Sequence, residues 1–194
     1  MAEIKSICVY CGSRNGVDPR HVEAARTLGT QMAQAGIELV YGGGRIGLMG
    51  VTADAVLAGG GRVCGIIPHH LQTVEVGHQG LTELHVVDSM HIRKQMMFER
   101  SDAFVVLPGG IGTLDETFEM ITWRQLRLHD RPVVVVDVGG YWQPYIKMID
   151  HIIAQGFAGQ EIRRLYDVVD SAEAVLPLLA RLPEPAIEAK PERL

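Results

Sequence analysis

Hydrophobic and polar positions along this chain follow two different periods. Short apolar runs rich in β-branched residues predict strands, at residues 4–11, 37–41, 62–67, 84–87, 103–107 and 133–136. Between these runs, apolar residues recur every three or four positions and predict helices, at about 21–34, 49–58, 91–100, 114–126 and 142–155. A weaker strand and helix are predicted at 165–169 and 172–182.

Strands that alternate with helices of about 10 to 15 residues are typical of βαβ units. The sequence therefore predicts an α/β fold with a doubly wound parallel sheet and helices on both faces. Residues 1–182 are expected to form one domain. The last stretch, PEPAIEAKPERL at 183–194, is rich in Pro and Glu, and we expect a flexible tail there.

Composition narrows the functional classes. The chain has 194 residues, 47% hydrophobic and 21% charged, and no apolar run approaches the roughly 20 residues of a membrane span. The N-terminus, MAEIKSICVYCGS, lacks the apolar core of a signal peptide, so a cytoplasmic location without membrane contact is expected. A net charge of −5 argues against a nucleic-acid surface, which needs a basic field. A local phosphate site stays possible, because backbone N–H groups and one or two Arg suffice.

Two of the three cysteines, Cys8 and Cys11, form a C-x-x-C motif. Cys8 lies in a predicted strand, where a spacing of three puts the two side chains on opposite faces. A redox pair normally lies at a helix N-terminus, and a zinc site needs ligands that Cys64 alone cannot supply. We expect neither a metal nor a redox cofactor.

Three glycine-containing loops each follow a predicted strand. They read CGSRNG at 11–16, GGGRIGLMG at 42–50 and PGGIGT at 108–113. Any one of them could be a tight turn between a strand and a helix. In open α/β sheets, however, ligands bind beyond the carboxyl ends of the strands, so three such loops on one edge favour a shared ligand.

The loops differ in what they can hold. Residues 42–47 match G-x-G-x-x-G, but the next strand ends without the acid that grips a ribose, which disfavours a dinucleotide. PGGIGT lacks the G-K-[ST] ending of a nucleoside-triphosphate loop. Its glycines precede a helix expected to begin near Thr113, where exposed N–H groups can hold an anion. The loop is interpreted as a monophosphate cradle.

Two further segments carry candidate chemistry. Thr113 to Glu116 reads T-x-x-E, which is either a capping box or a helix start that presents a functional acid. Ser89 is a candidate N-cap for a helix whose early turns hold Arg93 and Lys94. Lys94 has the features of a solvated cation, whereas Arg93 could offer a planar fork to a phosphate or ribose.

Taken together, the motifs resemble those of the LOG (Lonely Guy) family, the cytokinin riboside 5′-monophosphate phosphoribohydrolases. The family's P-G-G-x-G-T-x-x-E motif occurs at 108–116 and its M-H-x-R-K motif at 90–94. Also similar are C-G-S at 11–13, Y-G-G-G-x-x-G-L-M-G at 41–50, S-D-A-F at 101–104, W-x-Q-L at 123–126 and H-D-x-P-V at 129–133. The resemblance covers about residues 4–157; one departure is Arg14, where the family often has a second Ser.

The resemblance implies a Rossmann-like homodimer that cleaves a nucleoside 5′-monophosphate, AMP or a cytokinin nucleotide, into free base and ribose 5-phosphate without a cofactor. It assigns catalysis to Arg93 and Glu116. It assigns substrate binding to Gly12, Ser13, Gly43, Gly44, Glu75, Lys94, Gly109, Gly110, Ile111, Gly112, Thr113 and Thr122. Glu75 rests on the resemblance alone. The rival classes are a non-catalytic nucleotide or cofactor carrier and, third, a nicotinamide-dependent oxidoreductase.

Overall fold

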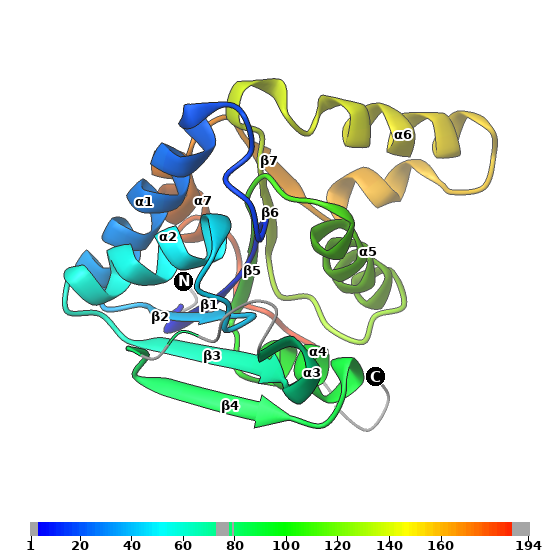
Figure 1. The fold of residues 1–194 in the computed structure, drawn as a ribbon. Coiled ribbons are helices and arrows are strands. Elements are labelled where there is room, and N and C mark those ends of the chain that lie inside the picture. The colour runs from blue at the N-terminus through cyan, green and yellow to red at the C-terminus, as the bar shows by residue number, and fades with distance from the viewer. Residues whose placement is uncertain (1–3, 73–77, 79, 188–194) are drawn as a thin grey trace.

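A seven-stranded sheet flanked by helices forms the molecule in the computed structural model, which describes residues 4–72, 78 and 80–187 (Figure 1). The strands are β1 (Ser6–Tyr10), β2 (Glu38–Tyr41), β3 (Val63–Pro68), β4 (Glu83–Val87), β5 (Ala103–Val106), β6 (Val133–Val136) and β7 (Asp167–Val169). The α-helices are α1 (Pro19–Gln34), α2 (Gly47–Ala58), α3 (His69–Gln72), α4 (Met90–Glu99), α5 (Ile111–Gln125), α6 (Gln143–Ala154) and α7 (Val175–Leu179). The 3₁₀ turns are η1 (Val138–Gly140), η2 (Gln160–Arg164) and η3 (Ala172–Ala174).

All paired strands are parallel, in the order β4-β3-β2-β1-β5-β6-β7. The chain builds outward from β1 to β4 and then returns to place β5 on the other side of β1. The strand order therefore reverses between β1 and β5, and the crevice beyond their carboxyl ends is where such folds bind ligands. The predicted doubly wound α/β fold is confirmed.

The two faces of the sheet carry separate cores. In β1, Ile7 and Val9 pack with residues of α1, α2 and α7, whereas Cys8 and Tyr10 pack with residues of α4, α5 and α6. Figure 1 shows these two groups of helices on opposite sides of the strands. Because successive side chains of a strand point to opposite faces, a sheet covered on both faces needs continuous apolar runs. β1 and β6, SICVY and VVVV, are of this kind.

Local capping explains where two of the helices begin. Asp18 caps α1 by accepting a hydrogen bond from the N–H of Arg20 at 2.9 Å, and Pro19 occupies the first helical position. This helix starts two residues before the predicted position, because Pro is tolerated in the first turn. Ser89 caps α4 as predicted, accepting from the N–H of Ile92 at 3.2 Å.

Two short helices depart from the predictions. The four residues of α3 were not predicted, because one turn is too short to show a helical period. The last helix was predicted over 172–182, but α7 spans only Val175–Leu179 and follows the separate turn η3. Pro177 has no N–H, so it fits only within the first turn, and the α-helix starts late for that reason.

Part of the predicted tail is attached to the domain. The backbone N–H groups of Ala186 and Ile187 donate to the carboxylate of Asp130, at 2.7 Å and 3.2 Å. Residues 188–194 lie outside the described part of the chain, so the predicted flexibility there stays a prediction. No helix among the described residues is long and apolar enough to cross a membrane.

Candidate active site

The three glycine loops meet at the switch point of the sheet. The N–H of Gly12 donates to the carbonyl oxygen of Pro108 at 3.0 Å, and the carbonyl oxygen of Gly12 accepts from the N–H of Leu48 at 3.0 Å. Gly12 thereby joins the loop after β1 to those after β2 and β5. The expectation that the three loops lie on one edge is confirmed.

Close backbone approach requires a glycine at position 47. Gly47 has a φ of 66°, and a Cβ atom there would lie 2.2 Å from the carbonyl carbon of Ser13. Only a residue without a side chain allows both the conformation and the contact. The third glycine of the G-x-G-x-x-G pattern thus allows the loop after β2 to pack against the loop after β1.

Helix α5 begins three residues earlier than the T-x-x-E pattern predicts. Its N-cap is Gly110, which offers no side-chain cap, and its first residue is Ile111. The carbonyl oxygen of Gly110 accepts the first helical hydrogen bond, from the N–H of Leu114 at 3.1 Å. Thr113 is therefore already inside the helix and buried, and the capping-box interpretation of Glu116 is wrong. Glu116 stands in the second turn, without that structural role.

The start of α5 has the features of an anion site. The first N–H groups of a helix, here those of residues 110–113, have no partner within the helix, and the helix dipole is positive at this end. Gly109 lies directly against this turn: a Cβ atom there would be 2.1 Å from Oγ1 of Thr113. The first glycine of PGGIGT is thus required for the backbone to approach Thr113.

A cavity of about 190 Å³ opens in front of this helix start. It is lined by Val9, Cys11, Gly12, Ser13, Gly42, Met49, Arg93, Met97, Gly110, Ile111, Gly112, Thr113 and Glu116. Arg93 comes from α4 and Glu116 from α5, so the fold brings the two predicted catalytic residues to one cavity.

The guanidinium of Arg93 is held by the ends of two strands. Its side chain is buried, with Nε donating to the carbonyl oxygen of Ile66 at 3.1 Å and Nη2 to that of Gly42 at 3.0 Å. A Cβ atom on Gly42 would lie 1.9 Å from Nη2. The first glycine of the 42–47 loop therefore makes room for Arg93.

Arg93 and Glu116 carry the charge of the cavity. Burial raises the pKa of Cys8, of Tyr10 and of Cys11, and the negative charge of Glu116 raises each of them further. These neighbours consequently stay neutral at physiological pH, leaving Arg93 and Glu116 as the charged side chains of the lining. All three cysteines are buried and free, and Cys8 and Cys11 belong to the opposite cores of the sheet, as predicted.

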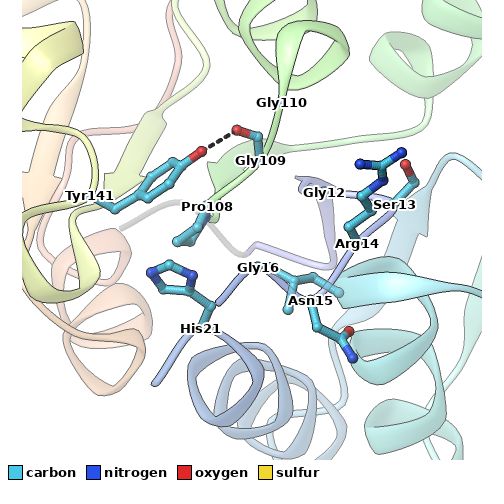
Figure 2. Close-up of a pocket in the computed structure, with 11 residues that line it drawn as sticks. Gly12, Ser13, Arg14, Asn15, Gly16, His21, Pro108, Gly109, Gly110 and Tyr141 are labelled. Carbon is cyan, nitrogen blue, oxygen red and sulfur yellow. Dashed lines mark hydrogen bonds between the residues drawn. The ribbon is translucent and has the colours of Figure 1, made fainter. Parts of the chain in front are cut away.

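A second pocket of about 350 Å³ adjoins the cavity and shares Gly12, Ser13 and Gly110 with it. Figure 2 shows it between the loop after β1, the 108–110 turn and Tyr141. The hydroxyl of Tyr141 donates to the carbonyl oxygen of Gly109 at 2.6 Å. Neither His21 nor Tyr141 was identified from the sequence, because neither carries a local motif.

The remaining predicted residues lie elsewhere. Lys94 forms ion pairs with Asp115 at 3.3 Å and Glu119 at 3.0 Å, outside the two pockets. Partial burial opposes the charged ammonium, but these two carboxylates outweigh it and raise the pKa of Lys94. Thr122 is exposed further along α5. Buried Gly43 and Gly44 do not line either pocket, whereas Gly42 does. Glu75 lies outside the described residues.

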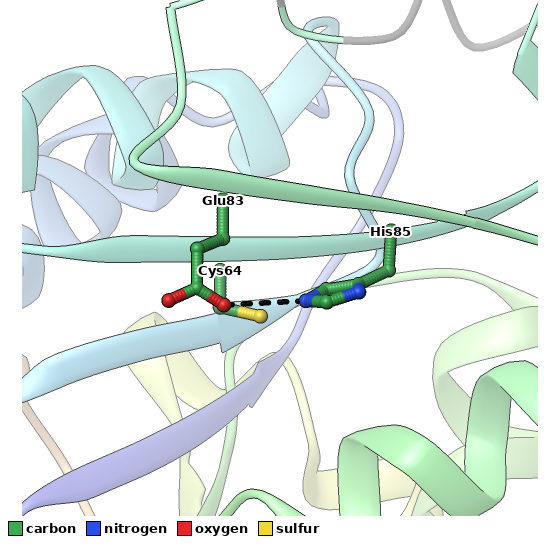
Figure 3. A group of neighbouring side chains, drawn as sticks. All are labelled: Cys64, Glu83 and His85. Carbon is green, nitrogen blue, oxygen red and sulfur yellow. Dashed lines mark hydrogen bonds and ion pairs between the residues drawn. The ribbon is translucent and has the colours of Figure 1, made fainter.

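One side-chain cluster has the composition of a metal site. Ligand atoms of Cys64, Glu83 and His85 lie within 4.8 Å of one another (Figure 3). However, Nη1 of Arg100 contacts both Sγ of Cys64, at 3.5 Å, and Oε2 of Glu83, at 3.0 Å. Arg62 binds the other carboxylate oxygen at 2.9 Å. A metal ion would have to displace a guanidinium that already balances this charge.

Comparison of the sequence with known families and proteins gives a consistent result. Residues 49–179 match the family model described as "Possible lysine decarboxylase". The chain is 43% identical over 184 residues to the rice (Oryza sativa subsp. japonica) cytokinin riboside 5′-monophosphate phosphoribohydrolase LOG, covering 94% of this chain and 76% of that protein. It is also 45% identical over 154 residues to the cytokinin riboside 5′-monophosphate phosphoribohydrolase of Rhodococcoides fascians. This match covers 79% of this chain and 78% of that protein.

Solved structures share the fold at lower identity. The molybdenum cofactor binding protein of Rippkaea orientalis superposes with a TM-score of 0.69 at 18% identity, over 93% of this chain and 98% of that one. The Moco carrier protein of Chlamydomonas reinhardtii gives a TM-score of 0.68 at 22% identity, over 93% and 100%. At these identities the likeness concerns the fold alone.

Proposed function

Because the chain belongs to the LOG family, we propose that it is a phosphoribohydrolase that cleaves the N-glycosidic bond of a nucleoside 5′-monophosphate. Water adds to the anomeric carbon, the bond from C1′ to the base breaks, and the products are ribose 5-phosphate and the free base. The observation that carries the proposal is the single cavity in which Arg93, Glu116 and the N-terminus of α5 meet. The substrates we propose are AMP and its N6-prenylated, cytokinin forms.

The phosphate is assigned to the start of α5. Backbone N–H groups of residues 110–113 donate to its oxygens, and the helix dipole favours its negative charge. Gly12 and Ser13 line the same cavity. The phosphate takes no part in bond breaking, so its binding serves to hold the ribose in position.

Glu116 is assigned the chemical role. As the bond to the base breaks, positive charge develops on the ribose, and an adjacent carboxylate stabilises that oxocarbenium character. The same carboxylate can orient the attacking water and accept its proton. Glu116 is not part of a capping box, because the N-cap of α5 is Gly110. The supporting fact is that it lines the cavity one turn beyond the phosphate cradle.

Arg93 is assigned to the ribose phosphate. Two of its N–H groups are used on the carbonyl oxygens of Ile66 and Gly42, which fixes the plane of the guanidinium at the cavity wall. A planar fork held in this way orients an anionic ligand. Glu75, Lys94 and Thr122 are proposed to line the substrate site on the strength of the family resemblance alone. A cytoplasmic homodimer stays a prediction.

The lysine decarboxylase description is not supported by the residues. A pyridoxal enzyme needs a lysine whose neutral amine forms a Schiff base. Lys94 follows the cavity residue Arg93 in the chain, and its two ion pairs raise its pKa, which favours the charged ammonium. The carrier alternative has only the likeness of fold in its favour.

The direct test is to incubate the purified protein with AMP or N6-prenyl AMP and to follow free base and ribose 5-phosphate by chromatography. We expect the two products in equal amounts, and far slower release from adenosine, which lacks the phosphate. Binding of the nucleotides without cleavage would replace the proposal with the carrier function. Absence of both binding and cleavage would refute it outright.

A further inference from the structure

The peptide plane that joins Gly109 to Gly110 lies where the cavity and the neighbouring pocket meet. Gly110 lines both spaces, while the carbonyl oxygen of Gly109 accepts the hydroxyl proton of Tyr141 at 2.6 Å (Figure 2). In a trans peptide the carbonyl and the following N–H point in opposite directions. The bond from Tyr141 therefore turns the N–H of Gly110 away from Tyr141, to the other side of the turn.

Backbone sterics alone would not fix this peptide plane. Glycine on both sides leaves its rotation nearly unrestricted, because no Cβ atom limits φ or ψ. A rotated plane would place a carbonyl oxygen where the first N–H of the anion site belongs, and the oxygen would repel a phosphate. We propose that Tyr141 is a positioning residue that fixes the orientation of the phosphate-binding turn, an inference that rests on the proposed function.

The surroundings hold Tyr141 in place for this task. Gly139 and Gly140, with φ of 62° and 79°, form the η1 turn immediately before it. The carboxylate of Asp137 closes the turn by accepting the N–H of Trp142 at 2.6 Å. The tyrosine ring itself packs edge-on between His21 and Trp142, with ring centroids 5.1 Å and 4.9 Å away. Its hydroxyl is thus presented to one carbonyl oxygen by a braced ring.

The sequence of the turn agrees with this arrangement. A Cβ atom on Gly109 would collide with Thr113, so Thr113 packs against the Cα side of Gly109 while Tyr141 binds its carbonyl oxygen. The two contacts come from segments that are separated along the chain, which explains why neither P-G-G-x-G-T nor the 139–142 segment predicts the other.

The chain supplies a matched control on the same segment. Tyr145, the third residue of α6, is buried, and its hydroxyl has no hydrogen-bond partner among the described residues. Tyr141→Phe removes a hydroxyl that binds the turn, whereas Tyr145→Phe removes one that binds nothing. Both changes keep the ring, so both variants should fold, and thermal unfolding will verify it.

The experiment measures kcat and KM for AMP, and the inhibition constant of ribose 5-phosphate, for the natural protein and both variants. Loss of one hydrogen bond of ordinary strength to the backbone corresponds to a change of about threefold to tenfold in a binding constant. We expect Tyr141→Phe to raise KM and the inhibition constant together by about that factor, with kcat within about twofold, because the phosphate is bound equally in the ground and transition states.

Tyr145→Phe should change neither constant. The proposal is overturned if Tyr141→Phe leaves KM and the inhibition constant as they are in Tyr145→Phe, or if only kcat falls. If the natural protein does not cleave AMP, the proposed function itself is refuted. Failure of the proposed function is therefore distinguishable from failure of the role proposed for Tyr141.

Discussion

Replacing Gly42 by Ala should damage catalysis through a residue 51 positions away. The φ of Gly42 lies outside the left-handed region, so Ala can adopt the backbone conformation. The new Cβ atom would lie 1.9 Å from Nη2 and 3.0 Å from Cζ of Arg93, whereas the next residue, Met49, has its Sδ 3.4 Å away. Arg93 must therefore retreat by roughly 1.5 Å to reach normal contact distance.

The size of the effect follows from the contact that is lost. Nη2 of Arg93 donates to the carbonyl oxygen of Gly42 at 3.0 Å, and this bond cannot survive the displacement. Hydrogen bonds of charged groups contribute about 1.5–3 kcal/mol, and a misplacement of about 1 Å in an active site costs up to about a hundredfold in rate. We expect kcat/KM for AMP to fall about tenfold to a hundredfold.

The assay is release of adenine at several AMP concentrations, by the natural protein, Gly42→Ala, Arg93→Ala and the double variant. If Gly42→Ala acts through Arg93, the double variant should be no slower than Arg93→Ala, because the two changes remove one interaction. Thermal unfolding shows whether each variant is folded. A folded Gly42→Ala protein with natural kcat/KM would refute the reasoning, as would effects that multiply in the double variant.

The remaining predictions concern Glu116 and His129. Glu116→Gln keeps the shape of the side chain but removes its charge, so kcat should fall by about a hundredfold or more with a folded protein, and near-normal hydrolysis would remove the catalytic role. Burial lowers the pKa of His129 to about 4, so its contribution to stability is complete above about pH 6.5 and is lost towards pH 4, by about 3 kcal/mol. Urea unfolding of both proteins between pH 7 and pH 4 should show that the free energy of unfolding of His129→Gln falls by about 3 kcal/mol less than that of the natural protein. An equal fall in both proteins would contradict the assignment.

The sequence predicted the features that depend on local pattern. The β6 strand has the predicted bounds, because four successive valines favour a buried strand and little else. Ser89 caps α4 as predicted, and the loops after β1, β2 and β5 meet because parallel strands end on the same edge. The resemblance to the LOG family assigned both Arg93 and Glu116 to catalysis, and the structure places both in one cavity.

Features that depend on distant contacts could not be predicted. The start of α5 was placed too late because Thr113 is a good N-cap by its residue type, while its actual contact is with the backbone of Gly109. The need for glycine at position 42 arises from Arg93, and the role of Tyr141 from the 108–110 turn. Neither pair leaves a signal in a local window, because the partners are more than 30 residues apart.

The central claim is that the start of α5 holds the phosphate while Glu116 faces the anomeric carbon. The most direct measurement is a crystal structure of Glu116→Gln with AMP, in which slow turnover preserves the substrate. The account predicts phosphate oxygens within hydrogen-bonding distance of the N–H groups of residues 110–113, with the side chain at position 116 beside C1′. A nucleotide bound elsewhere, or a ribose out of reach of position 116, would contradict it.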